Sequence, residues 1–262
     1  MDSHRPAQLL VSVGNDREAR TALAGGADLI DAKDPTSGAL APVSIDTFVR
    51  IHHVVDGQRP VTAALGDAGD QAAVRALAGR FAHAGAAFVK VGFAGVTDPE
   101  RIRALLKATR EGAGGGSAPT RVVAVAYADH QRGATCSPCQ ILAAAIDARV
   151  DGFLVDTFDK DGPGLTAHVA PSEYHGWVRT AHRSGLFVAL AGKVTASDMK
   201  SLGGSGADIV GVRGAACDQG RNGAVVESRV VELRALLHTP VPEAKTAVRV
   251  AANAVEFIPP AK

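Results

Sequence analysis

The segment QLLVSVGNDREARTALAGGADLIDAK, residues 8–33, contains the structural unit that determines the fold of this 262-residue chain. The apolar run at 8–13 is typical of a buried strand, the alanine-rich stretch at 15–25 has helical periodicity, and a second apolar run follows at 28–33. A strand, a helix and another strand in this order favour parallel pairing of the two strands.

The same unit recurs along most of the chain. We predict strands at residues 8–13, 28–33, 60–65, 86–91, 121–127, 152–157, 186–191 and 208–213. We predict helices after them at residues 15–25, 44–56, 69–84, 98–111, 138–149, 166–184, 196–203 and 224–238. Eight repeats favour closure into a barrel over an open sheet, and the chain has about the length of such a barrel. The predicted fold is therefore an α/β fold of the (β/α)8 TIM-barrel type.

Several helix starts carry capping residues. Ser44 and Asp70 each precede a helical pattern, where a side-chain oxygen can accept a backbone N–H of the first turn. Asp98 precedes Pro99, which suits the first helical position because its missing N–H is not needed there. These signals support the predicted boundaries.

The barrel accounts for residues 1–239 as a single domain. The glycine-rich stretch at 112–119 is expected to be a surface loop at the N-terminal end of the barrel. Residues 240–262 follow the last predicted helix and form a C-terminal arm or tail. This tail and the apolar outer helices lead us to expect a homo-oligomer.

Composition narrows the class of partner. The chain has 46% hydrophobic and 21% charged residues with a formal net charge of +1, and it contains no basic stripe that would indicate nucleic acid. No apolar run approaches the 18 residues of a membrane span, and three cysteines do not make a disulfide framework. We therefore expect a cytoplasmic protein with a small-molecule partner.

Charged residues stand where the predicted strands end. Asp31 and Lys33 end the second strand, Lys90 the fourth and Asp156 the sixth, with Lys160 four residues further on. Side chains alternate along a strand with a period of two, so Asp31 and Lys33 face the same way. Because TIM-barrel active sites lie at the C-terminal ends of the strands, we expect these side chains to converge.

Clustered lysines indicate a particular chemistry. An amine attacks a carbonyl only when neutral, whereas an ordinary lysine has a pKa near 10.4. Burial and neighbouring ammonium groups would lower that pKa in a cluster of Lys33, Lys90 and Lys160, and Asp31 and Asp156 could act as general acid and base. This pattern predicts imine formation; the alternative for any single pair is a solvated salt bridge.

The expected excess of positive charge at the barrel mouth favours an anionic ligand, with phosphate as the first candidate. Gly192 and Lys193 follow the seventh strand, and Arg213 and Gly214 follow the eighth, where such barrels commonly hold phosphate. We group Asp129, at the end of the fifth strand, with these substrate-binding residues. The alternative for the glycines is ordinary turn chemistry.

Two other motifs give little support for a metal, redox or dinucleotide site. Cys136 and Cys139 have the spacing of a redox motif or half a zinc site, but no second pair stands at a matching distance. A dinucleotide-binding glycine motif does not follow the first strand. No metal and no cofactor are expected.

The segments LLVSVGNDREARTALAGGADLIDAKDPTSGALA, FVKVGFAG, VVAVAYADHQR, FLVDTFDKDG and DIVGVRGAAC together resemble the (5-formylfuran-3-yl)methyl phosphate synthase family. The resemblance runs from about residue 8 to residue 238. It implies a TIM-barrel lyase of methanofuran biosynthesis that condenses two molecules of glyceraldehyde 3-phosphate.

The resemblance also implies residue roles. The family's Asp-x-Lys matches Asp31 and Lys33, its strand-four lysine matches Lys90, and its LDT…KDG pattern matches Asp156 and Lys160. Lys33 is then the Schiff-base lysine. Two alternatives remain open: a class I aldolase acting on another phosphorylated aldehyde, and a non-catalytic barrel that binds a phosphorylated metabolite.

Overall fold

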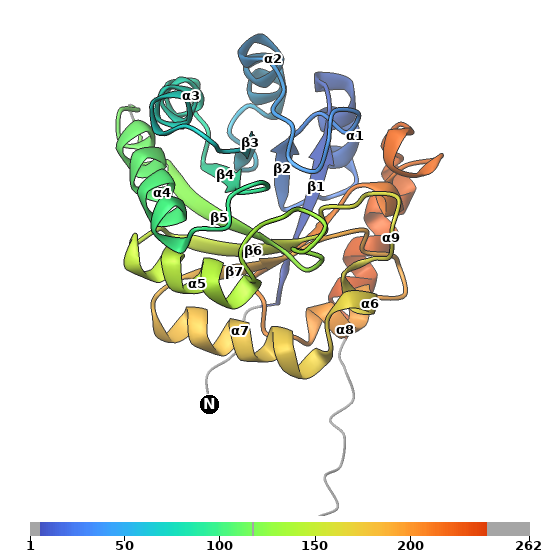
Figure 1. The fold of residues 1–262 in the computed structure, drawn as a ribbon. Helices are drawn as coiled ribbons and strands as arrows, with labels where there is room; N and C mark the ends of the chain where they lie inside the picture. The colour runs from blue at the N-terminus through green and yellow to red at the C-terminus, as the bar shows by residue number, and fades with distance from the viewer. Residues whose placement is uncertain (1–5, 117, 240–262) are drawn as a thin grey trace, which may run out of the picture.

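The computed structural model of the chain describes residues 6–116 and 118–239. Within these residues, eight parallel strands close into one barrel in sequence order, which confirms the predicted TIM barrel (Figure 1). The strands are β1 (Gln8–Val13), β2 (Leu29–Ala32), β3 (Val61–Asp67), β4 (Phe88–Gly92), β5 (Arg121–Tyr127), β6 (Gly152–Asp156), β7 (Phe187–Leu190) and β8 (Ile209–Val212).

Helices surround the barrel (Figure 1). They are α1 (Asp16–Ala24), α2 (Ile45–Val55), α3 (Gln71–His83), α4 (Pro99–Ala113), α5 (Pro138–Asp147), α6 (Leu165–His168), α7 (Pro171–Arg183), α8 (Met199–Gly203) and α9 (Glu227–Leu237). The predicted caps are confirmed: the side chains of Ser44, Asp70 and Asp98 accept backbone N–H groups at the starts of α2, α3 and α4.

The single helix predicted at 166–184 is wrong. The chain forms two helices there, α6 and α7, because Val169 and Ala170 are extended. Pro171 disfavours helical geometry in the residue before it, and it occupies the first position of α7. The side chain of Glu173 accepts the N–H of Ala170 at 3.0 Å, which satisfies a donor at this start.

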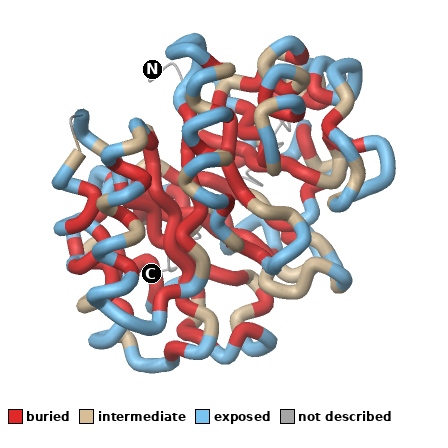
Figure 2. The backbone as a smooth tube through the Cα atoms, turned by 90° about the horizontal axis from the view of Figure 1, so that it is seen from above, coloured by how far each residue is buried: buried red, intermediate tan, exposed pale blue. Residues whose placement is uncertain are grey.

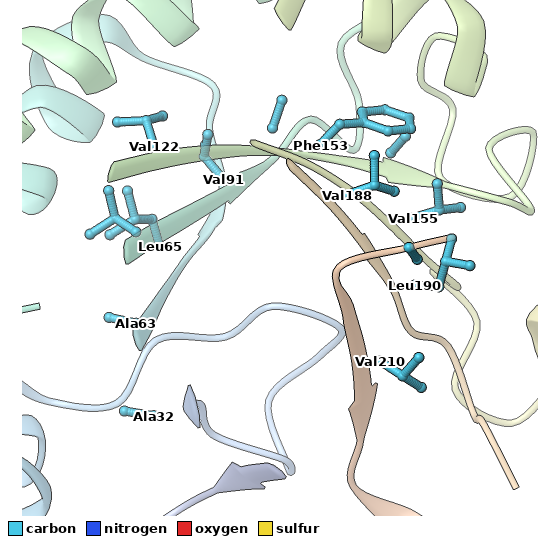
Figure 3. Packing of buried hydrophobic residues seen from close by; sticks show 14 of the residues in the cluster. Ala32, Ala63, Leu65, Val91, Val122, Phe153, Val155, Val188, Leu190 and Val210 are labelled. Carbon is cyan, nitrogen blue, oxygen red and sulfur yellow. The ribbon is translucent and has the colours of Figure 1, made fainter. Parts of the chain in front are cut away.

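The buried residues form two layers separated by the barrel wall. The outer layer lies between strands and helices and includes Val91, Phe153 and Val188 (Figure 3). The inner layer fills the barrel with residues such as Leu154 and Phe88. Figure 2 shows the buried backbone at the centre and exposed segments around it. Strand alternation therefore decides which side chains can enter the barrel mouth.

None of the helices in the described ranges is long and apolar enough to cross a membrane. The C-terminal arm predicted at 240–262 lies outside the described residues.

Candidate active site

The five residues predicted to be catalytic come together at the C-terminal end of the barrel. A cavity of about 630 Å³ opens there, and its lining includes Asp31, Lys33, Lys90, Asp156 and Lys160. They come from β2, β4 and β6 or from the segments that follow β2 and β6. Residues more than a hundred positions apart in the chain thus share one site.

Asp31 is held by three donors. The hydroxyl of Ser12 donates to its Oδ2 at 2.9 Å, the hydroxyl of Thr62 donates to its Oδ1 at 2.7 Å, and the amine of Lys90 forms an ion pair with Oδ1. Asp31 is fully buried and Lys90 is 3% exposed. Burial by itself raises the pKa of Asp31, but the nearby amines of Lys90 and Lys33 and the hydrogen bonds bring it below its usual value.

Asp156 has a different environment. Its Oδ1 accepts the amine of Lys160 at 2.7 Å and the N–H of Thr157 at 2.8 Å. Burial raises the pKa of Asp156, and the amines of Lys160 and Lys33 outweigh this effect, so the pKa lies below its usual value. Within the described residues no hydrogen bond reaches Oδ2 of Asp156, which leaves that oxygen available to a ligand.

Lys33 lies between these two pairs. Among the residues that the structure describes, its Nζ takes part in no hydrogen bond or ion pair, although the side chain is almost fully buried. Burial lowers the pKa of Lys33 to about 7, with Lys160 and Lys90 acting in the same direction and Asp156 and Asp31 in the opposite one. A large fraction of this amine is therefore neutral near neutral pH, as attack on a carbonyl requires.

The residues after β7 and β8 form the other side of the cavity. Gly192, Lys193 and Gly214, the residues predicted to bind phosphate, are part of its lining. Gly192 has φ +103°, and an added Cβ there would lie 2.8 Å from the backbone nitrogen of Thr157. A side chain would therefore be strained and crowded at this position. The amine of Lys193 donates to the carbonyl of Gly162.

Arg213 also lines this side, but its guanidinium is fully occupied. Its Nε donates to the carbonyl of Arg221 at 2.9 Å. Its terminal nitrogens form two bonds with the carboxylate of Glu18, at 2.5 and 3.0 Å, and bond the carbonyls of Ser12 and Gly223 at 3.1 and 2.8 Å. These contacts use all five N–H donors of an arginine. The geometry favours a bracing role for Arg213 over the predicted contact with phosphate.

Asp129 is not brought into the cavity lining. Its carboxylate accepts the backbone N–H groups of Phe158 at 2.6 Å and Asp159 at 2.9 Å. Asp129 thereby orders the loop that carries Lys160, so its position supports the site indirectly.

The structure adds four residues that the sequence had not indicated. Ser12 and Thr62 bind Asp31, Glu18 binds Arg213, and Arg221 lines the cavity. Ser12 and Thr62 had a detectable signal, since each is a polar residue within an apolar strand. Within the described residues, no group of three or more His, Cys, Asp or Glu side chains could hold a metal ion.

Together, the fold and the site define the class of protein: a (β/α)8 barrel with a buried lysine of low pKa at the C-terminal ends of its strands. The sequence model of 4-HFC-P synthase matches residues 9–234, and the chain belongs to this enzyme family.

Individual relatives agree with this assignment. The chain is 37% identical over 227 residues to (5-formylfuran-3-yl)methyl phosphate synthase of Methanopyrus kandleri, covering 86% of this chain and 95% of that protein. The protein of the same name from Methanobrevibacter smithii is 35% identical over 231 residues, covering 87% of this chain and 98% of that one.

Solved structures support the fold alone. Thiamine phosphate pyrophosphorylase from Pyrococcus furiosus has a TM-score of 0.56 at 14% identity, over 89% of this chain and 96% of that one. A 3-hexulose-6-phosphate synthase has a TM-score of 0.54 at 17% identity, over 88% of this chain and 99% of that one.

Proposed function

We propose that this protein condenses two molecules of glyceraldehyde 3-phosphate into (5-formylfuran-3-yl)methyl phosphate through a Schiff base on Lys33. Two C3H7O6P molecules minus one phosphoric acid and two waters give C6H7O6P, which is the furan phosphate. The reaction thus involves no net oxidation or reduction. The observation that carries the proposal is a buried lysine of pKa about 7 that lies between two carboxylates and has no partner among the described residues, in a chain of this family.

The neutral amine of Lys33 attacks the carbonyl carbon of one triose phosphate, and loss of water gives the imine. The positively charged imine acidifies the neighbouring C–H, and Oδ2 of Asp156 takes that proton to form an enamine. The enamine carbon then attacks the carbonyl of the second triose, whose developing oxyanion is stabilised by the amines of Lys160 and Lys90. Elimination of phosphate, ring closure with loss of two waters and hydrolytic release from Lys33, which returns the water lost on imine formation, complete the sequence.

The size and lining of the cavity support the binding of two substrate molecules. Its volume of about 630 Å³ falls within the range of ordinary small-molecule sites and accommodates two triose phosphates together. The lysine side lies over β2, β4 and β6, and the glycine-rich side follows β7 and β8. This arrangement allows the carbonyl carbons to meet at Lys33 while a phosphate group lies towards the glycine-rich loops.

The test is incubation of purified protein with glyceraldehyde 3-phosphate alone, followed by ultraviolet absorbance, mass and released phosphate. Borohydride added during turnover should fix a triose on the peptide that contains Lys33. Lys33→Ala should abolish both the adduct and the furan, whereas Lys107→Ala, which removes an exposed lysine of α4, should change neither.

Three results would contradict the proposal: an aldol product without a furan, binding without phosphate release, or an adduct on another lysine. The first indicates an ordinary aldolase. The second indicates a non-catalytic binding protein.

A further inference from the structure

Arg221 occupies an unusual position at the rim of the cavity. It belongs to the segment after β8, yet its guanidinium reaches the segment that follows Lys33 at the end of β2. Its Nε donates to the carbonyl of Pro35 at 2.8 Å and its Nη2 donates to the carbonyl of Gly38 at 2.5 Å. Arg221 also lines the cavity. It therefore connects the two segments at the mouth.

A comparison with Arg213 shows what is particular about Arg221. Every N–H donor of the Arg213 guanidinium binds a protein oxygen, and its Nε donates to the backbone carbonyl of Arg221. Arg221 forms no ion pair with any residue of the described chain, and its Nη1 has no hydrogen-bond acceptor there. The guanidinium is thus oriented by its Nε and Nη2 bonds, while Nη1 remains available.

The electrostatic setting points to an anion. The Arg221 guanidinium is partly buried, and this burial lowers its pKa, with Asp156 acting in the opposite direction. A partly buried cation that forms no ion pair within the described residues gains from an anionic ligand, and a guanidinium is well shaped to hold phosphate oxygens.

We propose that Arg221 is a substrate-binding residue that contacts a triose phosphate group through Nη1, on the β8 and β2 side of the cavity. Its other two nitrogens hold the segment after Lys33 in place. Phosphate recognition is thereby linked to the loop that adjoins the reactive lysine. This inference rests on the proposed function for its substrate, but its test includes a measurement that needs no turnover.

The first measurement is calorimetric titration with inorganic phosphate. The wild type is compared with Arg221→Gln and Arg221→Lys, and with Arg50→Gln as a control that removes an exposed arginine of α2. We expect Arg221→Gln to weaken phosphate binding by about tenfold or more, because a charge-assisted contact is lost. Arg221→Lys keeps the charge and should weaken it less, and it replaces the glutamine variant if that one does not fold. Arg50→Gln should bind as the wild type does.

The second measurement separates phosphate contact from a purely structural role. Borohydride trapping on Lys33 is compared for glyceraldehyde 3-phosphate and for glyceraldehyde, which has no phosphate. Arg221→Gln should reduce trapping of the phosphorylated aldehyde only. Equal reduction with both aldehydes, or unchanged phosphate affinity, would overturn the inference. A wild type that makes no furan refutes the proposed function instead, and the phosphate titration still decides the role of Arg221.

Discussion

The two carboxylate–lysine pairs in the barrel mouth are built differently. Asp31 and Lys90 belong to strands β2 and β4, and their side chains are 1% and 4% exposed. Asp156 and Lys160 are four residues apart, and Lys160 lies in a loop with its side chain 12% exposed. Both oxygens of Asp31 accept protein donors, whereas Oδ2 of Asp156 accepts none among the described residues.

This difference suggests that the two carboxylates have different roles. A carboxylate whose oxygens are all engaged is held in one place and one charge state, which suits a fixed counter-charge. A carboxylate with a free oxygen facing a cavity can receive a proton from a substrate. Asp31 is therefore expected to matter most for the integrity of the site, and Asp156 most for turnover.

The largest expected effect is that of Asp156→Asn on turnover. Removing a general base typically costs 10²- to 10⁴-fold, so we expect furan formation to fall by about a thousandfold. The free energy of unfolding should change little, because water in the cavity can solvate the partly exposed amine of Lys160. Rates of furan formation and thermal unfolding of both proteins test this.

Imine trapping on Lys33 serves as the internal control in Asp156→Asn, because it precedes the proposed proton transfer. It should fall much less than turnover does. If trapping and turnover fall together, Asp156 does not act after imine formation.

Asp31→Asn should affect the free energy of unfolding more clearly than Asp156→Asn does. The substitution leaves the buried amine of Lys90 without its carboxylate, and breaking a buried ion pair costs about 3 kcal/mol or more of stability. Chemical denaturation should therefore detect a clear loss for Asp31→Asn and almost none for Asp156→Asn. Equal stabilities of the two variants would remove the distinction between the pairs.

The pH dependence of imine formation reports the pKa of Lys33, which both carboxylate–lysine pairs influence. Its pKa of about 7 in the folded protein predicts that trapping increases with pH and is half-maximal near pH 7. The unfolded chain keeps this proton up to about pH 10.5, so the contribution of Lys33 to stability rises with pH between these values.

Removing a carboxylate near Lys33 should lower the pH midpoint of trapping, and removing a neighbouring amine should raise it. Asp156→Asn removes a negative charge that favours the protonated amine, so the midpoint should fall by about one pH unit, or roughly 1.4 kcal/mol. Asp31→Asn should lower it less, because Asp31 has the smaller influence on Lys33. Lys160→Met removes a positive charge and should raise it. A midpoint that stays near pH 10 in the wild type would contradict the buried, neutral lysine.

Much of the fold was predictable because the barrel repeats one local pattern eight times. Each apolar run and each cap, such as Asp98 with Pro99, carries its information within a few residues. Helical periodicity alone predicts one helix at 166–184, whereas Pro171 disfavours helical geometry in the residue before it and so divides the segment into α6 and α7. Exact strand ends depend on pairing with neighbours and are less visible in the sequence.

The site was predictable as far as strand alternation determines it. Asp31, Lys33, Lys90 and Asp156 lie on strands or directly after them, so their direction follows from the period of two. Arg213 and Arg221 both line the cavity and lie in the segment after β8, where backbone turns decide which guanidinium keeps a donor without an acceptor among the described residues. Sequence spacing contains no such information, and only the structure distinguishes the two arginines.

Ser12→Ala should have the smallest effect on stability and turnover, because it changes only one hydrogen bond to Asp31. It removes one of the donors to Asp31 and should cost about 1 kcal/mol of stability, because Thr62 and Lys90 still hold Oδ1. Turnover should fall only a few-fold, since the carboxylate keeps its charge. Denaturation and steady-state rates measure both quantities. A loss of turnover as large as that of Asp156→Asn would mean that the Ser12 hydroxyl itself moves a proton, and that the Asp31 pair is not a fixed counter-charge.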